Sequence, residues 1–344
     1  MAIHKPKWFS DDYVMVSTGP TCGLTKGGRA LNKVDPVTAR RIQIVDPETG
    51  GLIDVVNDKL LEDMEELVTY EGVPNKDEIS SDTLNFIPAS KLKIGCAVPI
   101  YYDHRYYDHF CAEIKENPIF SGFSSAPLSR LVKDKLIVIR KGHGSPKQEQ
   151  RIGEIPYIKV SDLRAGTMNI NPTNRVPKAI ASEFWKGLSS GIQAFDLICP
   201  ERTSKNIGDF CVVMPGQEQV LLTKEVIIMR PGPMAYFDAF YILWAMTLKI
   251  VRDQWRRIVF MQTNREDVGK RYLEIHIPIP PNREKADEVS KTFKEYYETI
   301  ARARIDLQKY LVESSLHHFY VSGAEESESY PVDEIVGDIV DNEV

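Results

Sequence analysis

Four side chains in the first third of the sequence are of the types that hold a metal ion in a nuclease. Asp103, Asp108 and Glu113 supply carboxylates, and Lys115 completes a Glu-x-Lys triplet. Magnesium takes oxygen ligands, and a metal-dependent nuclease needs its carboxylates to converge on the ion. A metal-dependent DNA nuclease is therefore one hypothesis for the function. A helix across residues 106–116, with these acids turned to the solvent, would contradict it.

Two histidines, His104 and His109, lie in the same segment. A separation of five residues does not place them on one face of a helix, unlike the i, i+4 pair of a zinc-binding helix. A third ligand is not evident. We expect the tyrosine-rich run 101–109 to pack or to form an interface, and we expect no metal site in this chain.

The charge is distributed unevenly along the sequence. Residues 1–125 hold 13 Lys and Arg against 19 Asp and Glu, residues 126–281 hold 23 against 15, and residues 282–344 hold 7 against 15. The net charges are therefore -6, +8 and -8. A basic region between acidic flanks is typical of a nucleic-acid-binding module, because neutralising phosphates supplies much of the affinity. A non-catalytic scaffold that binds an acidic protein would show the same charge and remains an alternative.

One loop of the basic region is a candidate phosphate site. The glycines of the loop at residues 142–146 would let the backbone approach a DNA strand closely. The cations around it are Arg140, Lys141, Lys147 and Arg151. A solvated hairpin turn is the alternative interpretation.

The pattern of apolar residues predicts an α+β chain. Short β-branched runs between glycines and prolines predict strands at residues 135–140, 155–160, 210–214, 220–222, 226–229 and 273–279, with a buried helix over 236–257. Nearer the N-terminus, helical spacing predicts an amphipathic helix over 57–70, capped by Asn57 or Asp58. Its acidic residues should form the exposed face, and its buried face should comprise Leu60, Leu61, Met64, Leu67 and Val68.

The most regular pattern lies near the C-terminus. Apolar residues repeat at alternating spacings of three and four from Ala286 to Tyr310, which predicts a helix about 37 Å long with a heptad seam. The seam residues are Ala286, Val289, Phe293, Tyr296, Ile300, Ala303, Leu307 and Tyr310. We expect a coiled-coil contact with a second copy or another protein, and packing on the chain's own domain is the alternative. Residues 319–344 are acidic and predict a mobile tail.

Secretion and membrane insertion are not expected. The N-terminal residues meet charge and proline before an apolar run forms. The most apolar stretch, 239–248, is about half the length needed to cross a bilayer. The five cysteines are scattered, without the close pairs of zinc sites or disulfide scaffolds. We expect a cytoplasmic protein with free thiols.

Three segments together resemble a known family. They are GEIPYIKVSDLRAG at Gly153–Gly166, VIIMRP at Val226–Pro231 with FDAFYIL at Phe237–Leu243, and IHIPIPP at Ile275–Pro281 before the predicted long helix. In this order and spacing they are similar to the DNA target-recognition domain of type I restriction-modification specificity subunits. A complete specificity subunit has two such domains, whereas this sequence has one set of motifs and no internal repeat. The loop at 261–268 also lacks the glycine usual in the family.

The resemblance implies a non-catalytic subunit of a restriction-modification or related phage-defence complex. Such a subunit recognises a DNA sequence and directs a separate N6-adenine methyltransferase, a nuclease or both to it. The expected partners are double-stranded DNA, the methyltransferase subunit, a nuclease subunit and a second copy bound through the long helix. S-adenosylmethionine and magnesium are expected in partner subunits alone.

The resemblance also places base contacts in loops, where Arg pairs with guanine and Asn or Gln with adenine. The candidates are Lys159, Arg164, Asn174, Arg175, Arg202, Lys205, Gln262, Asn264 and Arg265. Within the first motif, Pro156, Tyr157, Asp162 and Gly166 are expected to shape the turn rather than to contact DNA.

The N-terminal third is similar to a different protein. Residues 21–31, TCGLTKGGRAL, with the acidic stretch and predicted helix that follow, resemble the segment after the catalytic motif of type I N6-adenine methyltransferases. The catalytic motif itself is missing, because the segment Asn117–Phe120 lacks its second proline. We therefore predict an N-terminal mixed α/β region at 1–128, for partner docking or as a methyltransferase-like remnant. A β-rich DNA target-recognition domain at 129–281, a long heptad helix at 282–318 and an acidic tail at 319–344 follow it.

Overall fold

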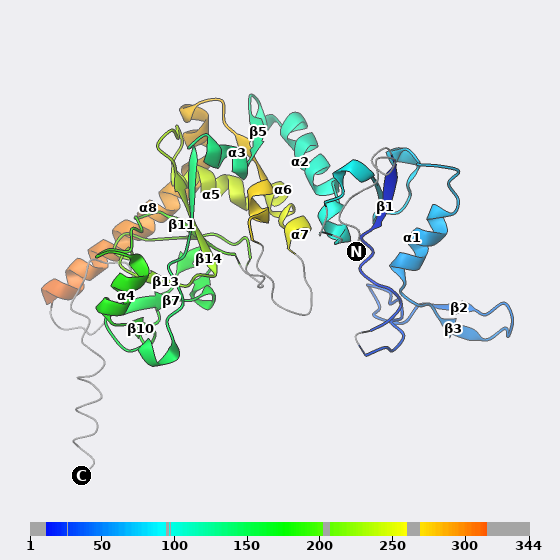
Figure 1. Ribbon diagram of the computed structural model, residues 1–344, viewed down its shortest axis with the longest axis horizontal. Coiled ribbons are helices and arrows are strands. Elements are labelled where there is room, and N and C mark those ends of the chain that lie inside the picture. The colour runs from blue at the N-terminus through cyan, green and yellow to red at the C-terminus, as the bar shows by residue number, and fades with distance from the viewer. Residues whose placement is uncertain are drawn as a thin grey trace, which may run out of the picture. The chain divides into compact units, whose positions relative to one another are not determined.

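The structure is a computed structural model that describes residues 12–25, 27–93, 96, 98–201, 207–259 and 269–314 (Figure 1). The chain divides into two compact units, residues 1–105 and 106–344. Both units combine short strands with helices, and the second contains a long C-terminal helix, so the fold class is α+β as predicted.

The division between the units precedes the predicted boundary at residues 128 and 129. Two elements ahead of that boundary are built into the second unit. Phe110 of α2 (Arg105–Glu116) is fully buried in its core. The strand β5 (Ser124–Pro127) pairs with β15 (His276–Ile279), which lies far along the sequence.

Among its described residues, the first unit contains two antiparallel strand pairs, one α-helix and short 3₁₀ turns. The strand β1 (Tyr13–Ser17) pairs with β4 (Leu84–Pro88). The strands β2 (Gln43–Val45) and β3 (Leu52–Asp54) form a hairpin that extends away from β1 (Figure 1). The helix α1 (Lys59–Leu67) begins where the Asp58 side chain accepts a hydrogen bond from the Leu61 backbone N–H, at 2.9 Å. This cap satisfies one of the free donors at the helix start and confirms the prediction.

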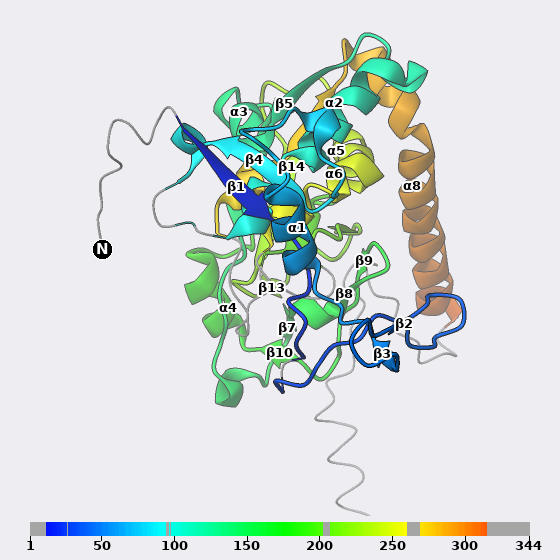
Figure 2. The ribbon, with the colours of Figure 1, turned by 90° about the vertical axis from the view of Figure 1, so that its right-hand side faces the viewer.

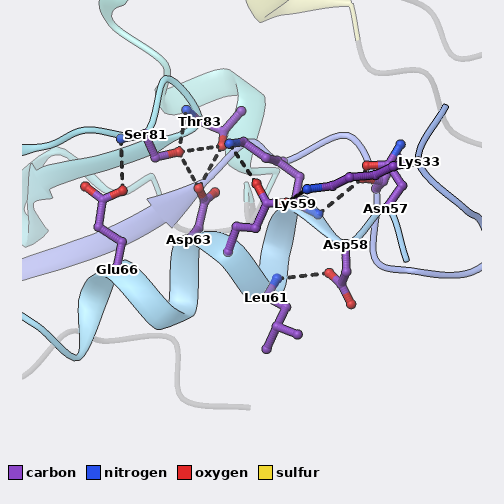
Figure 3. Close-up of polar contacts among 12 residues, drawn as sticks. Lys33, Asn57, Asp58, Lys59, Leu61, Asp63, Glu66, Ser81 and Thr83 are labelled. Atoms are coloured by element: carbon purple, nitrogen blue, oxygen red, sulfur yellow. Dashed lines mark hydrogen bonds and ion pairs between the residues drawn. The ribbon is translucent and has the colours of Figure 1, made fainter. Parts of the chain in front are cut away.

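The helix α1 is turned the opposite way from the prediction. Asp63 is fully buried and accepts hydrogen bonds from the hydroxyl groups of Ser17, Ser81 and Thr83, at 2.5, 2.5 and 2.8 Å. Figure 3 shows this carboxylate facing Ser81 and Thr83. The hydroxyl donors take the place of water, which allows a charged group to be buried. The prediction of an exposed acidic face was therefore wrong, and the exposed apolar residues are instead Leu60, Leu61, Met64 and Val68.

The second unit is organised around a six-stranded sheet. Its strand order is β6 (Ile137–Lys141), β14 (Val226–Pro231), β11 (Leu197–Pro200), β12 (Cys211–Val212), β9 (Thr167–Met168) and β8 (Leu163–Arg164). Neighbouring strands are antiparallel except β12 and β9, which are parallel. The strand β14 is buried on both faces, since Ile227 and Met229 belong to one core cluster and Ile228 to the other. Burial on both faces explains why its sequence is a continuous apolar run.

A smaller sheet and a short helix form another layer of the second unit. The three-stranded sheet has the order β10 (Arg175–Val176), β7 (Ile155–Ile158) and β13 (Leu221–Leu222). The helix α4 (Lys178–Trp185) packs on it, and Tyr157, Val176, Ala181 and Leu221 form their shared core.

Helices cover one face of the six-stranded sheet. The main core cluster joins this face to α2, α3 (Leu128–Lys133), α5 (Ala239–Thr247) and α8 (Arg283–Ser314). Figure 2 shows α8 along one side of the second unit, beside α5.

Two predicted elements of the second unit are shorter in the structure. The helix expected over 236–257 is divided into α5, α6 (Lys249–Arg252) and α7 (Trp255–Ile258), and the extended backbone of Leu248 separates α5 from α6. The Thr247 hydroxyl donates to the Leu243 carbonyl at 2.9 Å and so competes with the helical pattern at that point. The strand expected over 273–279 begins at His276, because residues 271–274 form a 3₁₀ turn.

The helix α8 divides the predicted seam between two environments. Its first residues, including Ala286 and Phe293, pack in the core of the second unit. Farther along, Tyr297 and Ala301 are buried while Tyr296 is 56% exposed. A straight α-helix rotates a heptad stripe by about 20° per heptad, so the seam gradually leaves the contact face. The alternative of packing on the chain's own domain therefore holds for the first half of the seam, and the exposed later members are Tyr296, Ala303, Leu307 and Tyr310.

Candidate nucleic-acid interface

The loop after β6, predicted to approach DNA through its glycines, packs against its own unit. A Cβ on Gly142 would lie 1.9 Å from the carbonyl oxygen of Thr223, and a Cβ on Gly144 would lie 2.2 Å from the Phe184 ring. The Gly144 backbone N–H donates to the Leu222 carbonyl at 3.1 Å. These glycines allow close internal packing within the unit, and an approach of DNA to this loop stays a prediction.

Two of the four cations around this loop have charged or aromatic partners. The Lys141 ammonium is 3.0 Å from the buried carboxylate of Glu201. The Arg151 guanidinium donates to the Pro146 carbonyl at 3.1 Å and lies over the Tyr157 ring. Both contacts hold the side chains to the protein.

The other two cations of this group are exposed, as Lys141 is, but have no carboxylate or aromatic ring in direct contact among the described residues. The Lys147 side chain lies on the surface beside a short 3₁₀ turn. The Arg140 guanidinium donates to the Gly191 carbonyl oxygen at 2.6 Å. Burial and the neighbouring Arg230 guanidinium lower the pKa of Arg140 from its ordinary value.

His143 joins three segments next to Arg140. Its Nδ1 accepts the Leu222 backbone N–H at 3.0 Å, and its Nε2 lies 2.9 Å from the Ser190 carbonyl oxygen. This pair of contacts requires a neutral imidazole that donates from Nε2. Burial lowers the pKa of His143, in keeping with the neutral form.

The segment Gly153–Gly166 forms a strand, a turn and the start of a hairpin. After β7, the Asp162 carboxylate accepts the Lys159 backbone N–H at 2.8 Å and closes the 3₁₀ turn Val160–Asp162. Gly166 has a φ of +74° at the turn between β8 and β9. Asp162 and Gly166 therefore shape the turn, as expected, and the Lys159 side chain is half-buried.

The remaining candidate base contacts fall into different places. Arg164 is exposed, and its Nε donates to the Ser161 carbonyl at 2.8 Å. Arg175 is partly buried on β10. Asn174 is 5% exposed and bonds the Tyr157 carbonyl through Nδ2, so its predicted role at a base was wrong. Other candidates lie outside the described residues: Arg202, Lys205, Gln262, Asn264 and Arg265.

Three tyrosines that the sequence analysis did not select join the resembling segments to one another. Tyr297 of α8 donates to the Gly166 carbonyl at 2.9 Å. Tyr241 of α5 donates to the Pro278 carbonyl, and Tyr236 donates to the Pro280 carbonyl, at 2.9 and 2.8 Å. Tyr236 and Tyr241 lie in or next to the second segment, so they could have been selected as polar groups in an otherwise apolar stretch. Tyr297 lies off the heptad seam, so the seam pattern does not indicate it.

The nuclease hypothesis is contradicted at its acidic residues. Residues 105–116 form the helix α2, in which Asp108 and Glu113 are about 140° apart around the axis. Asp108 is exposed, Glu113 accepts a hydrogen bond from Asn117, and Asp103 is paired with Arg105. Within the described ranges, no group of three or more His, Cys, Asp or Glu side chains is placed to hold a metal ion.

No family model matches this chain, and no curated protein gives a significant match. Three solved structures are similar to it. An S subunit of a type I restriction-modification system from M. genitalium is 11% identical, with a TM-score of 0.34. The match covers 64% of this chain and 56% of the chain of that structure. A structure described as the basis of complex assembly and conformational transition of the type I R-M system is 13% identical, with a TM-score of 0.34, over 79% of this chain and 75% of its own. The HsdS subunit from Thermoanaerobacter tengcongensis is 12% identical, with a TM-score of 0.33. The match covers 87% of this chain and 76% of the chain of that structure.

The chain therefore spans little more than half the length of the first of these structures. Because the identities and TM-scores are this low, the proposals below depend on the chain's own residues. Among the described helices, none is both long and apolar enough to cross a membrane.

Proposed function

We propose that this chain is a non-catalytic subunit that recognises a DNA sequence and directs a separate N6-adenine methyltransferase, a nuclease or both to it. The observation that carries the proposal is the assembly of the three resembling segments and the long helix in one unit. Tyr241 bonds the second segment to the third, and Tyr297 bonds α8 to Gly166 of the first. Gly166 and Tyr297 are 131 residues apart in the sequence, and Tyr241 and Pro278 are 37 apart, so these bonds join separate segments within the second unit.

The charge of the second unit supports DNA as its ligand. Residues 126–281 have 23 Lys and Arg against 15 Asp and Glu. Cations on a duplex-binding face release counterions from the phosphates, which gives affinity without regard to sequence. The exposed residues that we propose as contacts are Arg140, Lys147 and Arg164, and the half-buried Lys159 and Arg175 are further candidates. The candidates outside the described residues, Arg202, Lys205, Gln262, Asn264 and Arg265, remain proposed base contacts.

The exposed part of the α8 seam supports a protein partner. Tyr296, Leu307 and Tyr310 are 56%, 42% and 56% exposed. Leu307 follows Tyr296 by eleven residues and Tyr310 follows Leu307 by three, so all three lie on one stripe of the helix. A methyltransferase subunit is the partner that the resemblance implies, and S-adenosylmethionine and magnesium would belong to it. A second copy of this chain is the alternative occupant of the stripe.

Selection from a random-sequence duplex library tests the proposed function. The purified full chain, alone and with a candidate N6-adenine methyltransferase subunit, is incubated with the library without added metal, and bound duplexes are sequenced. Enrichment of one motif is the expected result. Salt-dependent binding without an enriched motif would contradict sequence recognition, and duplex cleavage by the chain alone after magnesium is added would contradict a non-catalytic role.

A matched pair of variants tests the stripe in the same assembly. Leu307→Asp alters the exposed stripe, and Lys309→Asp places the same charge on an exposed neighbouring position. We expect the first variant alone to lose the methyltransferase from a co-purified complex. Equal retention in both variants would remove the stripe as the docking surface.

A further inference from the structure

Two arginines on neighbouring strands converge on one carbonyl oxygen. Arg140 of β6 and Arg230 of β14 donate to the Gly191 carbonyl, at 2.6 and 2.9 Å. The strand register places Arg140 opposite Ile228 and Arg230 opposite Val138. Residues directly opposite in an antiparallel pair share a face, so the two arginines are diagonal neighbours on one face of the sheet.

The charges of this pair are not balanced locally. The Asp196 carboxylate is 2% exposed and forms an ion pair with Arg230. Arg140 donates to a carbonyl oxygen, which carries a dipole but no net charge. Two guanidinium groups therefore share one carboxylate. Burial and then the Arg230 guanidinium lower the pKa of Arg140, and the Asp196 carboxylate partly offsets them. Because two like charges lie close together, an additional negative charge beside them would be favourable.

The two arginines differ in their access to a ligand. The Arg230 side chain is 16% exposed and is held between Asp196 and Gly191. Arg140 lies on the exposed surface, at the edge of the sheet. The neighbouring loop residues Gly187, Leu188 and Ser189 are exposed as well. The free edge of the Arg140 guanidinium is therefore the part of this cluster that a ligand can contact.

Gly191 gives the cluster its close geometry. Its φ is +65°, in the region that favours glycine. A Cβ at this position would lie 3.3 Å from Nη1 of Arg140, which is tighter than an ordinary contact. The glycine thus allows its carbonyl to accept both arginines while the Arg140 guanidinium remains uncovered.

We propose that Arg140 binds a backbone phosphate of duplex DNA, and that Arg230, Asp196 and Gly191 form a support that fixes its guanidinium. The inference rests on the proposed function and adds the residues that orient this contact. A planar guanidinium held by one nitrogen can present two other N–H groups to the oxygens of a phosphate. Arg230 is a positioning residue in this site, since it acts through Gly191 and Asp196. The adjacent Lys141 is outside the site because Glu201 compensates its charge.

Duplex binding across a salt series tests the contact, with the full chain and a short random-sequence duplex. Arg140→Ala should reduce the slope of log affinity against log salt by about 0.9, the value for one phosphate contact. Arg140→Lys should retain most of that slope with weaker binding, because it keeps the charge and loses the fork. Arg130→Ala is the matched control, since Arg130 is exposed on α3 and pairs with Asp134. It should leave the slope unchanged.

A double-mutant cycle tests the support. In the Arg230→Gln background, Arg140→Ala should weaken binding by a smaller factor than in the wild type, because the guanidinium is no longer fixed. Circular dichroism and thermal unfolding check that Arg230→Gln folds, and Arg230→Lys replaces it if it does not. Equal factors in both backgrounds would overturn the positioning role.

The outcomes separate this inference from the proposed function. Steep salt dependence in the wild type with the same slope in Arg140→Ala and Arg130→Ala would overturn the phosphate contact and leave DNA recognition standing. Absence of duplex binding in the wild type would overturn DNA as the ligand. Pyrophosphate titration of ¹⁵N-arginine-labelled protein then decides the chemistry. A shift of the Arg140 Nε resonance, without one for Arg130, would assign the site to a small phosphate ligand, and no shift would remove the site altogether.

Discussion

Replacing Gly166 with alanine tests how the first resembling segment is joined to the long helix. The glycine has a φ of +74°, and a Cβ there would lie 2.5 Å from the Tyr297 hydroxyl. A residue with a Cβ in the left-handed region costs roughly 1–2 kcal/mol. Displacing the Tyr297 hydroxyl loses its 2.9 Å bond to the Gly166 carbonyl, which contributes about 1 kcal/mol. Gly166→Ala should therefore lower local stability by about 2–3 kcal/mol.

Hydrogen exchange provides a local measurement of this effect. The Val212 backbone N–H donates to the Gly166 carbonyl at 3.0 Å, so its protection against exchange reports on the same point. Tyr297→Phe removes the hydroxyl alone and should cost about 1 kcal/mol. In the double variant the new Cβ has no hydroxyl to displace. Its loss of stability should therefore be at least about 1 kcal/mol smaller than the sum of the losses in the two single variants. Additive losses would refute the steric coupling between the turn and α8.

Three further changes test other parts of the structure. Asp63→Ala leaves three hydroxyl groups without their acceptor, and should lower the stability of the β1 and β4 pair by about 3 kcal/mol, seen as faster exchange in both strands. Burial, assisted by a nearby arginine, lowers the pKa of His276 from 6.5 to about 4. The unfolded state therefore binds a proton at His276 at a higher pH than the folded state does. This contribution to the free energy of unfolding is full above pH 6.5 and falls as the pH drops toward 4, so His276→Gln should make the free energy of urea unfolding less dependent on pH in that window. On α8, Leu307→Asp should change stability by less than about 0.5 kcal/mol, whereas Ala301→Asp, at a buried position, should lower the unfolding midpoint sharply.

The sequence was most informative where burial depends on local pattern. The continuous apolar run of β14 identified a strand because both of its faces are buried. The Asp58 cap was predictable because its acceptor and donor are three residues apart. The heptad residues located α8 correctly. They did not identify its contact face along the whole length, because a heptad pattern and a straight helix differ slightly in period.

The orientation of α1 could not be predicted from its own residues. Its hydrophobic pattern indicated that Leu61 and Met64 would be buried. Asp63 is buried instead because Ser17 of β1 and Thr83, just before β4, supply hydroxyl donors from outside the helix. A carboxylate of this kind satisfies its hydrogen bonds only after the tertiary structure has formed. Helical periodicity contains no information on such partners.

At the candidate interface, the sequence shows the net charge but not the position of the cations that lack a carboxylate partner. The excess of positive charge over residues 126–281 is visible in the sequence, but its location depends on which cations meet carboxylates. Lys141 is compensated by Glu201, and Arg230 by Asp196. Arg140 is instead held by a carbonyl oxygen, which fixes its position, and it shares the Asp196 carboxylate with Arg230, so its charge is only partly compensated. A guanidinium that is already oriented loses less entropy when it binds, so a phosphate should favour it over a free lysine on the same surface.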